Sequence, residues 1–280
     1  MDVTTSQVLL AFSLTLIAGL STGIGSLISF FAKKENTTFL AVSLGFSAGV
    51  MIYVSFVEIL NDSFELLTVQ FGGKLGELYA VLAFFGGILL ILIIDMLVPE
   101  KENPHEIRTL ESEDKEELNS TNELHVEHKN KHKMMRVGYL TVLVLIIHNF
   151  PEGVVTFLAG LKEITIAIQI AIAVALHNIP EGISVSVPIY YATGSRKKAV
   201  WLSFLSGLAE PLGAIVAYLI LYPFLSDTLF GIIFGVIAGI MVYISLDELL
   251  PAAKEYGKYH EAIFGLIAGM AVMAFSILIF

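Results

Sequence analysis

The sequence predicts an all-α membrane protein with eight transmembrane helices and both termini outside the cytoplasm. Hydrophobic residues make up 56% of the 280-residue chain and charged residues 15%, whereas soluble domains carry about a quarter charged residues. The apolar residues lie in long runs, and about 20 such residues cross the bilayer core as a helix. No basic patch lies on a soluble domain, which argues against a nucleic-acid partner.

The apolar runs place the predicted spans, and one polar segment separates the third from the fourth. In chain order the spans cover residues 7–31, 38–60, 77–98, 137–160, 163–191, 197–222, 228–251 and 260–279. The segment 99–136 is strongly charged and poor in large apolar residues, so we predict a flexible cytoplasmic loop. The chain then divides into residues 1–98 (three spans), 99–136 (the loop), 137–191 (two metal-binding spans) and 192–280 (three spans).

Basic residues determine the predicted orientation. Most of them lie in the segments that follow the first, third, fifth and seventh spans. In that order these segments carry Lys33 and Lys34, seven basic residues from Lys101 to Arg136, Arg196–Lys198, and Lys254 with Lys258. Only Lys74 and Lys162 lie on the opposite side, so 14 of the 16 basic residues share one side. Because loops rich in Lys and Arg stay in the cytoplasm, this side is predicted to be cytoplasmic. The protein is expected in the cell membrane.

Two predicted spans resemble each other. Gly45–Leu60 reads GFSAGVMIYVSFVEIL and Gly235–Leu250 reads GVIAGIMVYISLDELL, with eight of 16 positions identical. A weaker match pairs Gly19 and Gly25 with Gly207 and Gly213. The matched spans run in opposite directions in the predicted topology, which indicates an inverted repeat of the kind found in secondary transporters. The alternative is that helices rich in small residues resemble each other through shared packing requirements.

The fourth and fifth spans carry the most informative motifs. Residues 148–153 read HNFPEG and residues 177–182 read HNIPEG, so the hexapeptides differ only at the third position. They are 29 residues apart, with a turn near Lys162 between them. At about 1.5 Å per residue, both histidines lie about 20 Å below that turn and face each other deep in the membrane.

These residues form a set of ligands suited to a divalent metal ion. A carboxylate at the bilayer centre costs at least about 2.5 kcal/mol, and a bound dication is the simplest compensation for Glu152, Glu181 and Glu210. His148 and Glu152 are one helical turn apart and share a helix face, as do His177 and Glu181. Two imidazoles and two carboxylates suit tetrahedral Zn²⁺. The chain has no cysteine, which excludes thiolate ligands.

A second, oxygen-rich site can form beside the first. Asn149, Asn178 and Glu210 supply its oxygens, and Glu152 and Glu181 are shared between the two sites. Pro151 and Pro180 cannot donate a backbone hydrogen bond, so each is expected to kink its helix and free a carbonyl. The alternative is that the His-Asn pairs are only interhelical hydrogen-bonding groups.

The paired HNxPEG motifs, the Glu210-Pro211 step of the sixth span and the long third loop resemble the ZIP (Zrt/Irt-like) metal transporters. The resemblance covers almost the whole chain. It implies a 3+2+3 arrangement of helices and import of metal into the cytosol without nucleotide. It also implies a substrate range of Zn²⁺, Fe²⁺, Mn²⁺, Co²⁺ and Cd²⁺. Met51 aligns with a position that can contact the primary metal in relatives, although an ordinary packing role is the alternative.

Four further acidic residues lie near the ends of spans. Glu58 is predicted towards the outer end of the second span and is expected to help metal reach the site. Asp247 and Glu248 lie towards the inner end of the seventh span, near Asp95 of the third, and are expected to help metal leave. The alternative is that these residues only mark helix ends in the membrane interface.

We therefore expect a secondary transporter and not an enzyme, with divalent metal as its substrate, no cofactor, and the lipid bilayer as its surroundings. A homodimer is an open alternative. Two other functions remain in contention, namely an intramembrane metal-dependent hydrolase and a metal sensor. The hydrolase is disfavoured because the chain has no HExxH motif, and an ATP-driven pump is disfavoured because it has no Walker A loop.

Overall fold

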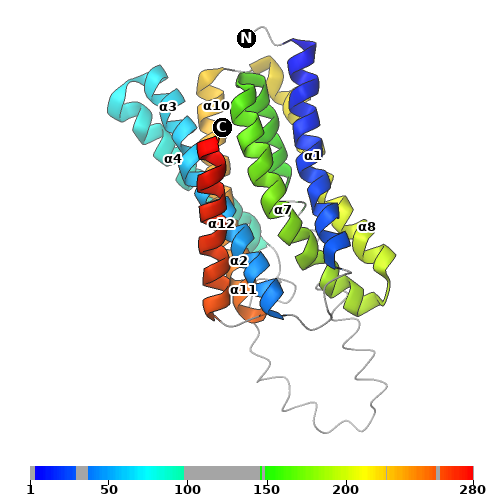
Figure 1. Cartoon of the computed structure of the whole chain (residues 1–280). Coiled ribbons are helices and arrows are strands. Elements are labelled where there is room, and N and C mark those ends of the chain that lie inside the picture. Colours follow the sequence, from blue (N-terminus) through cyan, green and yellow to red (C-terminus); the bar gives the residue numbers. More distant parts are fainter. Residues whose placement is uncertain are drawn as a thin grey trace, which may run out of the picture.

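The computed structural model describes residues 4–29, 37–97, 146, 149–224, 226–256 and 259–279. All secondary structure within these ranges is helical, which confirms the predicted all-α class. The helices form an elongated bundle, and α12 ends towards the end of the bundle where α1 begins (Figure 1). Seven helices in the described ranges are long and apolar enough to cross a membrane, in agreement with a multi-pass membrane protein.

The helices follow the predicted spans in order. The first three spans are α1 (Thr5–Ser29), the continuous α2 (Thr37–Val54), η1 (Ser55–Ile59) and α3 (Leu60–Phe71), and α4 (Gly73–Leu97). The later ones are α7 (Ile164–Thr193), α8 (Arg196–Gly207) with α9 (Ala209–Val216), η2 (Ala217–Leu221) and η3 (Tyr222–Phe224), then α10 (Asp227–Ile244) with η4 (Ser245–Leu249) and α11 (Leu250–Tyr256), and α12 (Tyr259–Ile279). Residues 149–162 of the fourth span are also helical. The predicted loop at 99–136 lies outside the described residues.

The second span is longer than predicted. The apolar pattern ends it at residue 60, but the helix continues through α3 to Phe71. Asp62 interrupts the hydropathy, yet it is only 9% exposed because α3 packs against α4 and α10. Ser63 Oγ also donates a 2.6 Å hydrogen bond to the carbonyl oxygen of Gly231 in α10. The helix ends at Gly72, whose φ of 79° favours glycine.

A π-helical turn interrupts the second and the seventh spans at matching positions. The turn is η1 in the second span and η4 in the seventh, and their first residues are Ser55 and Ser245, both within the two similar stretches of sequence. Each serine hydroxyl donates to a methionine carbonyl one turn earlier, at 2.6 Å and 2.7 Å. π turns are rare and occur mostly at functional sites. They were not predicted from the sequence.

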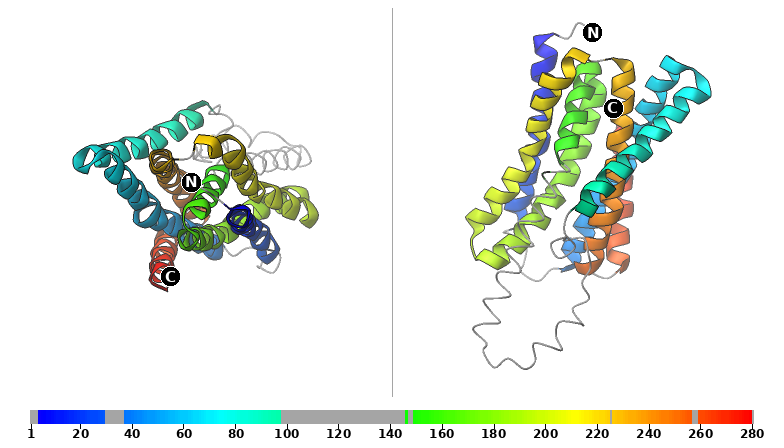
Figure 2. Two further views of the ribbon diagram at one scale, coloured as in Figure 1. Left: turned by 90° about the horizontal axis from the view of Figure 1, so that it is seen from above. Right: turned by 180° about the vertical axis from the view of Figure 1, so that it is seen from behind.

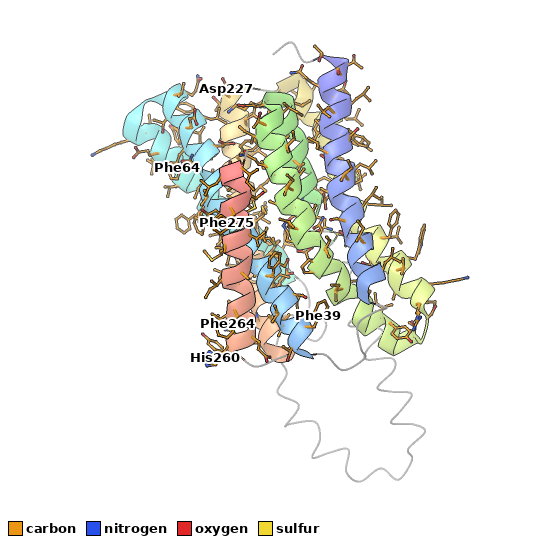
Figure 3. The ribbon with its side chains drawn as sticks, in the orientation of Figure 1. Phe39, Phe64, Asp227, His260, Phe264 and Phe275 are labelled. Carbon is orange, nitrogen blue, oxygen red and sulfur yellow. The ribbon has the colours of Figure 1, made fainter. Side chains whose placement is uncertain are left out.

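The second and seventh spans run in opposite directions. Phe39, near the start of α2, lies at one end of the bundle, and Asp227, the first residue of α10, lies at the other (Figure 3). The similar stretches of sequence are therefore antiparallel in the folded chain.

The described helices form two groups. In the first, α1 packs against α7, α8 and α9, and residues 149–162 join them through Gly160 against Ala11 of α1 and Phe157 against Tyr218 of η2. In the second, α2 packs against α12, and α10 packs against α3 and α4. The view along the bundle shows the two groups side by side (Figure 2). Contact between α2 and α7 joins them.

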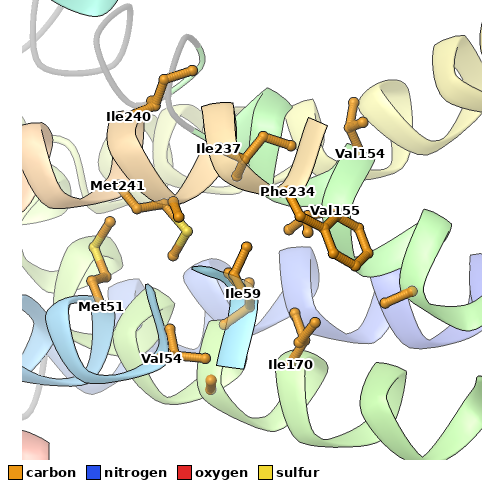
Figure 4. Packing of buried hydrophobic residues seen from close by; sticks show 14 of the residues in the cluster. Met51, Val54, Ile59, Val154, Val155, Ile170, Phe234, Ile237, Ile240 and Met241 are labelled. Carbon is orange, nitrogen blue, oxygen red and sulfur yellow. The ribbon is translucent and has the colours of Figure 1, made fainter. Parts of the chain in front are cut away.

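An apolar cluster fills the space between the groups. Ile170 and Val155 come from the first group, and Ile59, Phe234 and Met241 come from the second (Figure 4). These side chains are fully or almost fully buried. The groups therefore meet at this level through interlocking apolar side chains.

Candidate metal centre

The middle of α7 presents three of the predicted site residues. His177, Asn178 and Glu181 lie on this helix, which continues through Pro180. Because a proline nitrogen cannot donate, a carbonyl in the preceding turn loses its helical partner. Hydroxyls from the neighbouring helices bond to carbonyls at this level: Ser21 of α1 donates to Ala175, and Ser47 of α2 donates to His177, each at 3.2 Å. The helix is therefore held from both groups beside its functional residues.

The structure brings together one residue from each hexapeptide. His177 Nε2 lies 3.1 Å from Glu152 Oε1. Both residues are fully buried. An imidazole and a carboxylate held this close at depth offer one nitrogen and one oxygen to a divalent metal ion. The second carboxylate of α7, Glu181, is also fully buried, and its Oε1 accepts a 3.4 Å hydrogen bond from Ser47 Oγ.

Ser47 is a site residue that the sequence interpretation missed. It lies in an otherwise apolar stretch of the second span, and its hydroxyl contacts both the His177 carbonyl and the Glu181 carboxylate. A small polar residue in a membrane helix was the only available signal, and serines are common in such helices for packing reasons alone. Ser47 places the second group of helices in contact with α7.

A second pair of polar side chains lies next to the first. Asn178 Nδ2 donates to Glu210 Oε1 of α9, and it also donates to the Ala18 carbonyl of α1 at 3.0 Å. Asn149 Nδ2 donates to the Ser206 carbonyl at 3.2 Å. All three of these side chains are fully buried. Of the three residues of the predicted second site, Asn178 and Glu210 are therefore in contact, and Asn149 bonds to a carbonyl one turn before Glu210.

Several oxygens of these buried side chains have no hydrogen-bond partner. Within the described residues, Asn149 Oδ1, Glu152 Oε2, Asn178 Oδ1 and Glu210 Oε2 are buried and unpaired. Buried carboxylate and amide oxygens without a partner are costly, and a bound cation relieves that cost. No three His, Asp or Glu side chains of the described set, which does not include His148, converge closely enough to hold an ion. The His148 position predicted from the first hexapeptide lies outside the described residues.

The contacts around these side chains repeat in pairs. A side chain at Gly182 would collide with the carbonyl oxygen of Thr22, and a side chain at Gly153 would collide with that of Glu210. Asn178 donates to the carbonyl of Ala18, and Asn149 donates to that of Ser206. Ala18 and Ser206 are 188 residues apart in the sequence, and so are Thr22 and Glu210. Thr22 therefore occupies, on α1, the position that Glu210 occupies on α9.

Two further predicted residues lie on the second span. Met51 is fully buried in the apolar cluster, near Val54 (Figure 4). Glu58 is half-buried in the π turn η1.

The predicted inner acidic residues lie in the second group. Asp247 and Glu248 belong to the π turn η4, and both are half-buried. Asp95, near the end of α4, accepts a 3.4 Å hydrogen bond from the hydroxyl of Tyr243 in α10. The structure thus brings α4 and α10 together at this acidic end.

Comparison with known proteins assigns the family. The model of the ZIP Zinc transporter family matches residues 4–277. The chain belongs to the ZIP family. A relative named Zinc transporter ZupT in Streptococcus mutans is 58% identical over 270 residues, which cover 96% of this chain and 97% of that protein. Proteins of the same name in Clostridium perfringens and Oceanobacillus iheyensis are 55% and 57% identical, over 98% of this chain and 97% and 98% of theirs.

Membership of the ZIP family extends over the whole bundle. The matched range includes both groups of helices and both hexapeptides. The family resemblance inferred from the HNxPEG motifs is therefore confirmed. In this ZIP chain the buried side chains of Glu152 and His177 lie close together, and Asn178 donates a hydrogen bond to Glu210.

Proposed function

We propose that this protein is a secondary transporter that imports Zn²⁺ into the cytoplasm across the cell membrane, with Fe²⁺, Mn²⁺, Co²⁺ and Cd²⁺ as further substrates. The observation that carries the proposal is the approach of His177 Nε2 to Glu152 Oε1, 3.1 Å apart and fully buried between membrane helices. The names of the relatives, all of them zinc transporters, support zinc as the main substrate. The metal is the cargo and not a cofactor.

The primary site in this proposal consists of His148, Glu152, His177 and Glu181. Two neutral imidazoles and two carboxylates balance the charge of a dication and suit tetrahedral coordination. The secondary site consists of Asn149, Asn178 and Glu210, with Glu152 and Glu181 shared. The unpaired oxygens described above support it, because their desolvation is offset when a cation binds.

The proposed architecture is eight spans in a 3+2+3 arrangement with an inverted repeat and both termini outside. The matching π turns, the opposite directions of α2 and α10, and the paired contacts of Gly182 with Thr22 and of Gly153 with Glu210 support the repeat. The distribution of basic residues supports the orientation. The cytoplasmic loop would then be residues 99–136, between the three-span segment 1–98 and the metal-binding segment 137–191, with three spans in 192–280.

Transport through such a site requires release as well as binding. A site with two histidines and three glutamates binds tightly, so we propose that one group of helices moves against the other to open it alternately to each side. Such a movement would separate the interlocking apolar side chains of the cluster and break the Ser47 hydrogen bonds to α7. Glu58 would serve the outer approach, and Asp95, Asp247 and Glu248 would serve the inner exit.

The decisive experiment is zinc uptake into proteoliposomes. Wild-type protein should accumulate Zn²⁺ down its gradient without any added nucleotide, whereas His177→Ala and Glu152→Gln should lose most of that flux. Glu77→Gln is the matched control for the carboxylate, because Glu77 is exposed on α4 and its change should leave uptake unaltered.

The same assay separates the alternative functions. A metal sensor would bind zinc without flux, and an intramembrane hydrolase would bind zinc and need another substrate to show activity. Equal uptake by the wild type and the two site variants would reject the proposed site.

A further inference from the structure

A hollow of about 480 Å³ opens on the surface where α8 begins. It is lined by Arg196, Lys197, Val200 and Trp201. This corner of the bundle lies at the end opposite to the start of α1 (Figure 1). None of these residues takes part in the proposed metal centre, so the hollow needs an explanation of its own.

One face of α8 changes from charged to aromatic to aliphatic along its length. Lys197, Trp201 and Leu205 are four residues apart and therefore lie on the same side of the helix. All three are exposed, Trp201 to 59% and Leu205 to 36%. At about 1.5 Å per residue, Trp201 lies about 6 Å and Leu205 about 12 Å along the axis from the lysine.

The opposite face of the same helix is turned inward. Ala199 and Ser203 are fully buried, and Ser203 Oγ donates to carbonyls of α1 and α7. Because that face packs on the bundle, the Lys197–Trp201–Leu205 face must point away from it. In a membrane it meets lipid, and the sequence of charge, ring and aliphatic chain follows that of a phospholipid from its phosphate to its acyl chains.

The aromatic and basic side chains around the hollow are held in place. The Trp201 ring stacks on Phe204 with a centroid distance of 6.0 Å and an angle of 22°. The Arg196 guanidinium lies 5.8 Å from the centroid of the Tyr190 ring. Lys197 and Lys198 are exposed, and neither is paired with a carboxylate in the part of the chain that the structure describes. Positive charge thus accumulates at the rim of a hollow whose floor is apolar.

We propose that this hollow binds the headgroup of an anionic phospholipid. The phosphate lies between the Arg196 and Lys197 side chains, which line the hollow, Trp201 packs at the glycerol level, and the acyl chains follow Leu205 along α8. A free phosphate ion would use the two basic side chains but would leave the exposed aromatic and aliphatic residues uncovered, so a lipid explains more of the surface. The inference is independent of the metal site, because it uses none of its residues.

The chain supplies its own reporter for this site. Trp201 is the single tryptophan of the protein, so all tryptophan fluorescence comes from the rim of the hollow. The full chain is reconstituted in phosphatidylcholine vesicles with increasing fractions of either brominated phosphatidylglycerol or brominated phosphatidylcholine. Both lipids carry the same quenching chains, so any difference between them arises from the headgroup.

We expect brominated phosphatidylglycerol to quench Trp201 at about a 30-fold lower fraction than brominated phosphatidylcholine, since each of the two basic residues near an anionic headgroup contributes about 1 kcal/mol. The Arg196→Gln/Lys197→Gln double variant should lose this preference. Lys254→Gln is the matched control, because Lys254 is an exposed lysine of α11, outside the hollow, and its change should leave the preference intact. Equal quenching by the two lipids in the wild type, or an equal loss in the Lys254 variant, would overturn the proposal.

Discussion

Replacing Ser47 by alanine tests whether the second group of helices supports the metal centre. The Ser47 hydroxyl donates to the His177 carbonyl at 3.2 Å and to Glu181 Oε1 at 3.4 Å. A hydrogen bond to a charged group contributes about 1.5–3 kcal/mol. The Ser47–Glu181 distance is near the upper limit for such a bond, so we take the lower value, about 1.5 kcal/mol, which is roughly a tenfold change in a dissociation constant.

Ser47→Ala should therefore raise the Kd for Zn²⁺ about tenfold, measured by isothermal titration calorimetry on the purified protein. Loss of a hydrogen bond that orients a metal ligand typically lowers affinity by about 10–100-fold, which agrees with this estimate. The physical reason is that Glu181 becomes free to leave the position in which it can meet the ion.

Ser55→Ala is the matched control for this experiment. Ser55 follows in the same span and is equally buried, but within the described residues its hydroxyl bonds to the Met51 carbonyl of its own helix and to no residue of α7. Both variants should lose similar thermal stability, and only the Ser47 variant should lose zinc affinity. A Kd within twofold of the wild type for Ser47→Ala, or the same shift in both variants, would refute the reasoning.

Three further predictions concern packing, backbone and protonation. Gly153→Ala should destabilise the protein by about 1–3 kcal/mol, because the new methyl group meets the backbone of Glu210. Gly86 has open space around it, so Gly86→Ala should be neutral or stabilising when both variants are compared by thermal unfolding. Gly72→Ala should lower the unfolding temperature, since φ of 79° costs a side chain about 1–3 kcal/mol, and an unchanged midpoint would contradict this. Zinc binding should weaken from pH 7 to pH 5, because protons compete with the metal for the imidazole and carboxylate ligands. Calorimetry at several pH values checks this, and affinity that rises in acid would oppose it.

Hydropathy and residue spacing predicted much of this fold. The helices α1 and α12 begin and end close to the predicted spans, because a long apolar run has only one stable conformation in lipid. The second span was predicted too short, since Asp62 breaks the apolar pattern although tertiary packing against α4 and α10 buries it. Hydropathy measures the preference of a residue for lipid and not its contacts within the protein.

The sequence by itself determined the membrane class, the family, and which polar residues enter the membrane, because these depend on composition, local order and covalent spacing. Only the tertiary structure decided that Glu152 meets His177, that Glu210 meets Asn178, and that Ser47 reaches α7 from the other group of helices. These contacts depend on how each helix is rotated about its axis and how closely the backbones approach at Gly153 and Gly182. Rotation and approach result from packing among helices distant in the chain, and no single stretch of sequence encodes them.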